Sequence, residues 1–345
     1  MGFYYFSNSS PPIRRNRPTF TEESTKKQPR KTNQKRVNDI IMYLFLRTRG
    51  GAYTTWSKRF SVTKLANRII IPERSVFVKQ VVEVLKEQFK YAPMIFRIAR
   101  YEDKATYQSH YLGLAWQILN PLIQVAIYYF VFGFAMRGRS GVEGASYIEW
   151  MLAGIIPWFF ISAVILQGAN SIFNKIHLVS KMKFPMSVMP NITIVSNLTS
   201  YVTMMIIFFA LLFIKGAPVS MYWAQFFYYF VAMIAFLFSV TLLNATISVL
   251  VRDYYVMLQS VLRVLFYVSG VVWNLNTMLP GWVVDLLKLN PIVYIIEGFR
   301  DSFVGHKGFW QEPSYTVYFW LITLVCLYVG SVLHMKFRER FVDYL

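Results

Sequence analysis

The residues of this chain that could act on a charged ligand are a few cations set among apolar residues. Arg97, Arg100 and Lys104 follow a run with apolar residues at helical spacing, which is typical of a helix whose charged side contacts anionic lipid head groups. Arg263 lies inside a long apolar stretch, where a charge is costly and usually faces a cavity or a functional path. Snorkelling of this guanidinium to the surface, or pairing with a neighbouring helix, would account for Arg263 equally well.

Motifs for catalysis or nucleotide binding are absent from the sequence. It contains no GxxxxGK[ST] phosphate-binding loop, no HExxH and no CxxC, and Cys326 is its single cysteine. An enzyme that works by acid–base chemistry would need paired carboxylates or histidines. The carboxylates that come into question are scattered along the chain, and these are Asp253, Asp285, Glu297 and Asp301. We therefore expect no metal and no cofactor bound by this chain.

Composition and hydropathy indicate an all-α polytopic membrane protein. Hydrophobic residues make up 55% of the 345 positions and charged residues 15%. Several uncharged runs reach the roughly 18 residues or more that predict a transmembrane helix, whereas a β-barrel would show short alternating segments. The runs predict six spans, at about 112–136, 150–169, 188–214, 221–251, 254–273 and 315–335.

The net charge of +19 is concentrated toward the N-terminus, where residues 1–115 hold 22 Lys and Arg against 8 Asp and Glu. The loops predicted to lie on the same side as the N-terminus are also the more basic ones. The positive-inside rule then places both termini in the cytosol. Attraction to membrane lipids accounts for this charge. Because no nucleic-acid-binding motif is visible, we expect no nucleic-acid partner.

Two regions are expected along the chain. Residues 1–75 are basic and predicted to be largely disordered, since polar and charged residues dominate their start. Residues 76–345 form the transmembrane domain, which begins with an amphipathic interface helix at about 78–104. Between the fifth and sixth spans, Pro280-Gly281 and Asn290-Pro291 bound two apolar pieces too short to span. We expect two re-entrant helices there, packed against the outer ends of the spans.

The segment after the second span is short, basic and able to form a helix. Apolar and polar residues interleave in it, and the ones we single out are Phe173, Asn174, Lys175, Ile176, Leu178 and Lys181. An ordinary positive-inside loop would look similar. The alternative is a short helix that docks on a cytosolic motor protein, with Phe173, Ile176 and Leu178 as the packing residues.

From residue 76 onward the chain contains a series of short motifs in a recognisable order, although each motif alone is only weakly specific. They are Tyr107–Gly113 leading into Trp116, Asn120-Pro121-Leu122, Gly154–Trp158, Gly168–Ser171 with Lys181 and Phe184-Pro185, Arg252-Asp253, Asn290–Tyr294 and Gly298–Asp301. Together they resemble the permease subunit of ABC-2-type exporters of cell-surface polysaccharides. Residues 291–302 are most similar to the wall teichoic acid exporters of Gram-positive bacteria, so wall teichoic acid is the expected cargo. O-antigen or capsular polysaccharide is the alternative. The long N-terminal extension departs from the family pattern.

This resemblance implies a complex of two permease chains and two ABC ATPase subunits in the bacterial plasma membrane. ATP and Mg²⁺ would bind to the ATPase, and the permease itself would not be catalytic. The segment after the second span would be the coupling helix, and the interface helix would lie near the substrate entrance. The substrate would be an undecaprenyl-diphosphate-linked glycopolymer. Its diphosphate would meet Arg97, Arg100 and Lys104, and Arg263 would line the path.

Aromatic residues crowd the first two spans, and the four we single out are Tyr128, Phe132, Trp158 and Phe159. Aromatic belts at the membrane interface explain most such residues. In an exporter, some could instead stack on sugar rings in the channel. Two other classes of protein are less favoured. A membrane enzyme of polyprenyl-phosphate metabolism would need the paired carboxylates noted above, and an ion channel would conduct without an ATPase.

Overall fold

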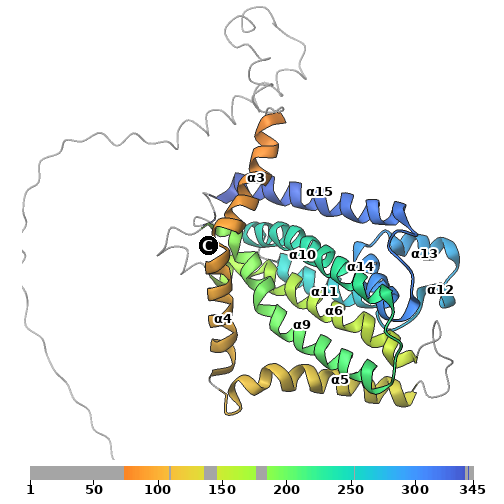
Figure 1. Ribbon diagram of the computed structural model, residues 1–345. Coiled ribbons are helices and arrows are strands. Elements are labelled where there is room, and N and C mark those ends of the chain that lie inside the picture. The colour runs from red at the N-terminus through yellow and green to blue at the C-terminus, as the bar shows by residue number, and fades with distance from the viewer. Residues whose placement is uncertain are drawn as a thin grey trace, which may run out of the picture. The chain divides into compact units, whose positions relative to one another are not determined.

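The computed structural model describes residues 74–108, 110–135, 146–175, 185–251, 253–338 and 341 (Figure 1). The chain divides into two units, Met1–Ile71 and Pro72–Leu345, and all the described residues belong to the second. The predicted N-terminal extension therefore lies almost wholly outside the described part. All regular structure in the described residues is helical, as the sequence predicts.

The predicted interface helix forms as two pieces. These are α3 (Arg74–Lys90) and α4 (Ala92–Gln108). The break falls just before Pro93, because proline lacks an amide hydrogen and suits only the first turn of a new helix. Both helices run across one end of the long helices (Figure 1), which we call the α4 end.

The two sides of α3 and α4 differ in burial. Val84, Ile95 and Ala99 are buried against the bundle. Phe89 is 81% exposed and Val82 is also exposed. A helix that lies on a membrane surface needs apolar side chains that protein does not cover, and these two residues supply them.

Among the residues that the structure describes, four helices are long and apolar enough to cross a membrane. They are α6 (Tyr147–Ala169), α9 (Met189–Ile214), α10 (Gln225–Leu250) and α15 (Pro313–Phe337). Short 3-10 turns precede α9, at Met186–Val188, and α10, at Met221–Ala224. These four helices correspond to the predicted second, third, fourth and sixth spans.

The predicted first and fifth spans have weaker counterparts. Following a 3-10 turn at Gly113–Ala115, α5 (Trp116–Ala135) has 20 residues but is not among those four apolar helices. The fifth span was predicted to reach residue 273, but α11 (Tyr254–Val268) ends five residues earlier. The reason is Gly270, whose φ of +63° turns the backbone out of the helix. At 15 residues, α11 extends over about 22 Å, so six full spans remain a prediction.

The end of the bundle opposite α4 is built from short helices, and we call it the α13 end (Figure 1). It contains α12 (Leu275–Met278), α13 (Gly281–Lys288) and α14 (Pro291–Arg300), followed by a π-helical turn at Asp301–Gly305. The Asn290 side chain accepts a hydrogen bond from the Ile292 amide at 3.1 Å and so caps α14. Helices α13 and α14 match the two predicted short helices, whereas α12 was not predicted. Because α14 packs on α6 and α10, protein shields it as expected, but its re-entry into the membrane remains a prediction.

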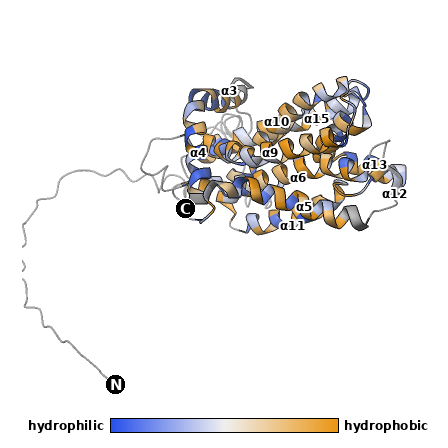
Figure 2. Ribbon diagram, turned by 60° about the horizontal axis from the view of Figure 1, so that its bottom comes forward, coloured by the Kyte–Doolittle hydropathy of each residue, from blue (hydrophilic) through white to orange (hydrophobic). Residues whose placement is uncertain are grey.

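Helix α6 lies at the centre of the packing, against α9, α10 and α14. Hydrophobic residues follow its length, whereas hydrophilic ones gather on α3 and α4 (Figure 2). Gly168 allows a close approach to α10, because a Cβ added there would lie 2.7 Å from the Thr241 methyl carbon. At the α4 end a second cluster joins Ile95 of α4, Ile192 of α9 and Phe341. Helix α4 is thus packed onto the bundle through this second cluster.

Candidate functional site

A cavity of about 720 Å³ lies between α5, α6, α9 and α11, and we call it the aromatic cavity. It brings together four of the predicted site residues, Tyr128, Trp158, Phe159 and Arg263, from three different helices. The remaining predicted aromatic residue, Phe132, belongs to α5, but its side chain is outside the described part of the structure.

Aromatic rings that contact one another form the walls of this cavity. The pairs are Tyr128–Phe159, Trp158–Phe266 and Phe160–Tyr201, with ring centroids 5.4, 5.6 and 4.9 Å apart. Tilted contacts of this kind are favourable and hold each ring in place. The cavity therefore presents rigid apolar surfaces from α5, α6 and α11.

Polar groups complete the lining. Asn120 and Gln124 come from α5 and Gln259 from α11, and none of the three was predicted as a site residue. Tyr201 of α9 is 3% exposed, and its hydroxyl has no hydrogen-bond partner among the described residues. Amides and hydroxyls both donate and accept hydrogen bonds. Such groups between aromatic rings suit a ligand rich in hydroxyl groups.

Arg263 is the one charged side chain in the described lining of the aromatic cavity. It lies nine residues into α11, about 14 Å along the helix axis from Tyr254. Its side chain is exposed and borders the cavity. An anionic group that enters the cavity would therefore meet this cation.

The predicted coupling segment begins with α7 (Ser171–Asn174), and its described part ends at Lys175. Ile172 is fully buried in the second hydrophobic cluster, whereas Phe173 is 57% exposed and Asn174 is also exposed. Phe173 therefore has free apolar surface of the kind that docking would use. Three further predicted residues lie outside the described part of the chain, and these are Ile176, Leu178 and Lys181.

Lys175 points away from solvent and pairs with α4. Its ammonium nitrogen lies 2.8 Å from a carboxylate oxygen of Glu102, and the two side chains are 10% and 33% exposed. Burial lowers the pKa of Lys175, and the nearby Glu102 carboxylate opposes this only in part. The ion pair joins the segment after α6 directly to α4.

Helix α4 directs its acidic residues toward the bundle and its cations away from it. Asp103 accepts hydrogen bonds from the hydroxyls of Ser196 and Thr199 on α9, at 2.7 and 2.8 Å. The three predicted head-group residues are all exposed, and these are Arg97, Arg100 and Lys104. The helix is thus tied to α9 while its cations remain available to an anionic ligand or lipid.

The acidic residues of the interface helices were missed in the sequence, although a signal for them exists. Ile95, Ala99 and Glu102 follow one another at spacings of four and three, which places them on one face of a helix. On α3, Glu87 forms an ion pair with Arg338 beyond α15, at 2.7 Å. An acidic residue at helical spacing with buried apolar residues should therefore be considered as a possible ion-pair or hydrogen-bond contact between its helix and the bundle.

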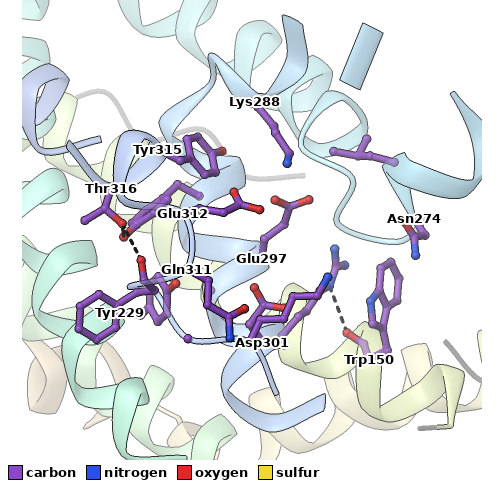
Figure 3. A pocket seen from close by; sticks show the side chains of 17 residues that line it. Trp150, Tyr229, Asn274, Lys288, Glu297, Asp301, Gln311, Glu312, Tyr315 and Thr316 are labelled. Carbon is purple, nitrogen blue, oxygen red and sulfur yellow. Dashed lines mark hydrogen bonds between the residues drawn. The ribbon is translucent and has the colours of Figure 1, made fainter. Parts of the chain in front are cut away.

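A second cavity, of about 370 Å³, lies at the α13 end, and we call it the polar cavity (Figure 3). Arg300 on its wall is only 5% exposed. The guanidinium carbon lies 3.5 Å from the centre of the Trp150 ring, and its nitrogens donate to the carbonyl oxygens of Val271, at 2.6 Å, and Trp150, at 3.3 Å. Gly154 leaves room for it, since an added Cβ would lie 2.5 Å from the guanidinium. Arg300 therefore holds α14, α6 and the turn after α11 together.

The fold brings together two of the four carboxylates that are scattered along the sequence. Glu297 and Asp301 both line the polar cavity, whereas Asp253 and Asp285 do not. Within the described ranges there is no group of three or more His, Cys, Asp or Glu placed to hold a metal ion. The arrangement therefore gives no direct support for a metal-dependent enzyme.

Comparison with known proteins decides the family. The sequence profile described as "ABC-2 type transporter" matches residues 94–304, which run from α4 to the π-helical turn. The chain belongs to the ABC-2 type transporter family. ABC-2 permeases are multi-pass membrane components of transporters and work with an ABC ATPase subunit. Both the aromatic cavity and α7, with which the predicted coupling segment begins, lie within the matched range of this permease.

Several relatives of the permease have been named. The O-antigen export system permease protein RfbA of Myxococcus xanthus is 25% identical over 263 residues, which cover 76% of this chain and 99% of the relative. A protein of the same name from Klebsiella pneumoniae is 25% identical, with 70% and 91% covered. The inner membrane transport permease YadH of Escherichia coli K12 is 27% identical, with 54% and 75% covered.

Proposed function

We propose that this permease is the transmembrane subunit of an ATP-driven exporter of a lipid-linked cell-surface polysaccharide. The observation that carries the proposal is the aromatic cavity, whose described lining combines tilted ring pairs, side-chain amides and one arginine. O-antigen or a similar polymer is the favoured cargo, in place of wall teichoic acid. The reason is that relatives named for O-antigen export align over 91% or more of their length.

The proposed assembly has two permeases and two ATPase subunits, with six spans per permease and both termini in the cytosol. One cavity of this size is too small for a polymer chain, but a path between two copies could be wider. Helices α5 and α11, which border the cavity, also carry exposed apolar residues, among them Ile123, Ile127, Val261 and Val264. A second permease or lipid would cover them.

The proposed mechanism separates the head group from the sugars. Arg97, Arg100 and Lys104 would collect the undecaprenyl diphosphate at the membrane surface, because guanidinium and ammonium groups bind phosphate oxygens strongly. Arg263 would stabilise the same charge at mid-depth. Aromatic faces hold sugar rings with little dependence on their identity, which suits a polymer that must keep moving.

The proposed coupling route starts at Phe173. ATP binding in the partner would press on α7, and the Lys175–Glu102 ion pair would carry that movement to α4. Helix α4 would pass it to α9 through Asp103. An ATPase gene beside the permease gene would support the existence of this partner.

Substitution of Arg263 tests the path. Export of surface polysaccharide should fall at least tenfold in Arg263→Met and be partly retained in Arg263→Lys, because lysine keeps the charge but not the planar donor geometry. The measurement is surface polysaccharide per cell at equal permease levels in the membrane. Export that is unchanged by Arg263→Met would reject a role for Arg263 in the path.

Substitution of Phe173 tests the coupling. Phe173→Ala should weaken co-purification with the ATPase or uncouple ATP hydrolysis from export. Phe89→Ala is the matched control, since Phe89 is also an exposed phenylalanine near the α4 end. Equal behaviour of the two variants in binding and in ATPase assays would remove Phe173 from the docking surface.

A further inference from the structure

The polar cavity takes no part in the proposed path. It shares no lining residue with the aromatic cavity. Its walls come from the start of α6, from α14 and from the start of α15, and three exposed residues lie at its mouth, namely Lys307, Gln311 and Glu312. A ligand could therefore reach it from the α13 end without passing through the aromatic cavity.

The lining of the polar cavity is charged but balanced. Three acidic and three basic side chains contribute to it, and these are Glu297, Asp301, Glu312, Lys288, Arg300 and Lys307. In Figure 3 the side chains of Glu297, Glu312 and Lys288 point toward a common space. A balanced lining gives little net attraction for a metal ion or a bare phosphate. It does offer many hydrogen-bond acceptors and donors, which a neutral hydroxylated ligand can use together.

Aromatic rings form one wall of the same cavity. Tyr294 and Tyr315 meet edge to face, with centroids 5.0 Å apart. The Tyr294 hydroxyl already has a partner, because it lies 3.0 Å from the Thr316 hydroxyl. By contrast, the buried hydroxyl of Tyr315 has no hydrogen-bond partner among the described residues. A buried hydroxyl without a partner is costly, so a ligand that reached it would be favoured.

We propose that the polar cavity is a second glycan site, which binds one neutral sugar unit at the α13 end. Its volume of about 370 Å³ is at the small end of ligand pockets, which suits a single ring and not a polymer segment. Carboxylates accept hydrogen bonds from adjacent sugar hydroxyls, while Lys288 and the Tyr315 hydroxyl donate to others. The assignment of the sugar to the exported glycan depends on the proposed function, whereas binding itself does not.

The test uses the full-length permease in lipid nanodiscs. Saturation-transfer NMR is recorded with the methyl glycosides of mannose, rhamnose, galactose and N-acetylglucosamine as probes. We expect transfer to at least one of them. Glu312→Gln should weaken that binding about tenfold, because one charge-assisted hydrogen bond is lost. Glu312 is exposed at the mouth of the cavity, so this variant should fold, and Tyr315→Phe should weaken the same probe through the hydroxyl alone.

Asp285→Asn is the matched control, because Asp285 is an exposed carboxylate on α13 that does not line the polar cavity, so its loss should leave the binding of these probes unchanged. Absence of transfer to all four glycosides would overturn the proposal, as would transfer that neither Glu312→Gln nor Tyr315→Phe reduces. Polysaccharide export in cells separates the two proposals. Intact export with no glycoside binding rejects only the second glycan site. If probe binding depends on Glu312 but deletion of the permease leaves the amount of surface polysaccharide per cell unchanged, only the export function is rejected.

Discussion

The ion pair between Lys175 and Glu102 allows a quantitative test, because its two partners differ in exposure. The Lys175 side chain is 10% exposed and that of Glu102 is 33% exposed. Removal of Glu102 leaves a buried ammonium without its partner. Removal of Lys175 leaves a carboxylate that water still reaches. We therefore expect the variants Glu102→Gln and Lys175→Met to lose different amounts of stability.

The expected magnitudes follow from the cost of a buried unpaired charge. Loss of one partner of a buried ion pair costs about 3–5 kcal/mol, and partial exposure of this pair reduces that to about 2–4 kcal/mol for Glu102→Gln. Lys175→Met should cost only about 1 kcal/mol. The double variant leaves neither charge behind and should lie within about 1 kcal/mol of the wild-type chain. If the double variant equals the wild type, the coupling energy between the two sites is about 3–5 kcal/mol, the sum of the two single losses.

The assay is unfolding of the wild-type chain and the three variants in mixed detergent–SDS micelles, followed by circular dichroism. Lys104→Met is the control, since Lys104 is an exposed cation on the same helix and its loss should change the unfolding free energy by less than about 0.5 kcal/mol. Equal losses in the two single variants would refute this reasoning. So would a double variant whose loss equals the sum of the single losses.

Three other predictions use the same unfolding assay or the yield of folded protein. Because burial lowers the pKa of Lys175, the wild-type chain should gain stability relative to Lys175→Met as the pH rises toward the ordinary lysine value of 10.5, since the unfolded state then binds more protons. Arg300→Met should lower the unfolding free energy by about 3–5 kcal/mol, because it removes a ring contact and two hydrogen bonds to buried carbonyls. Gly298→Ala should reduce the folded fraction in size-exclusion chromatography, because the new methyl group would overlap the Tyr229 ring. Gly281→Ala, where nothing lies within 4 Å, should not.

Much of the helical bundle could be predicted because hydropathy is a local property of the chain. Helices α6, α9, α10 and α15 each occupy one continuous apolar run, so composition and length suffice to find them. The end of α11 could not be found in this way. Apolar residues continue past Gly270, and only the left-handed conformation of that glycine ends the helix. Helix α12 was missed because four residues carry no periodic signal.

The candidate site was predicted only as separate residues. Tyr128, Trp158 and Phe159 were chosen as aromatic residues in apolar spans, and Arg263 as a charge in an apolar run. Their meeting in one cavity depends on how α5, α6 and α11 pack, which no local pattern contains. The ion-pair partner of Lys175 likewise could not be predicted from the sequence, because Glu102 lies 73 positions earlier in the chain.

Charge is arranged differently at the two ends of the bundle, and the difference matters for export of a diphosphate-linked lipid. On α4, the acidic side chains Glu102 and Asp103 bond to the bundle, so they do not neutralise the exposed cations of the same helix. At the α13 end, acids and bases balance within the polar cavity. A diphosphate would therefore be attracted to the α4 end, stabilised at mid-depth by Arg263, and held weakly at the α13 end. In the proposed export cycle, this gradient favours the entry of the head group at one end and its release at the other. The same balance leaves the α13 end free to contact the sugars instead of the phosphate.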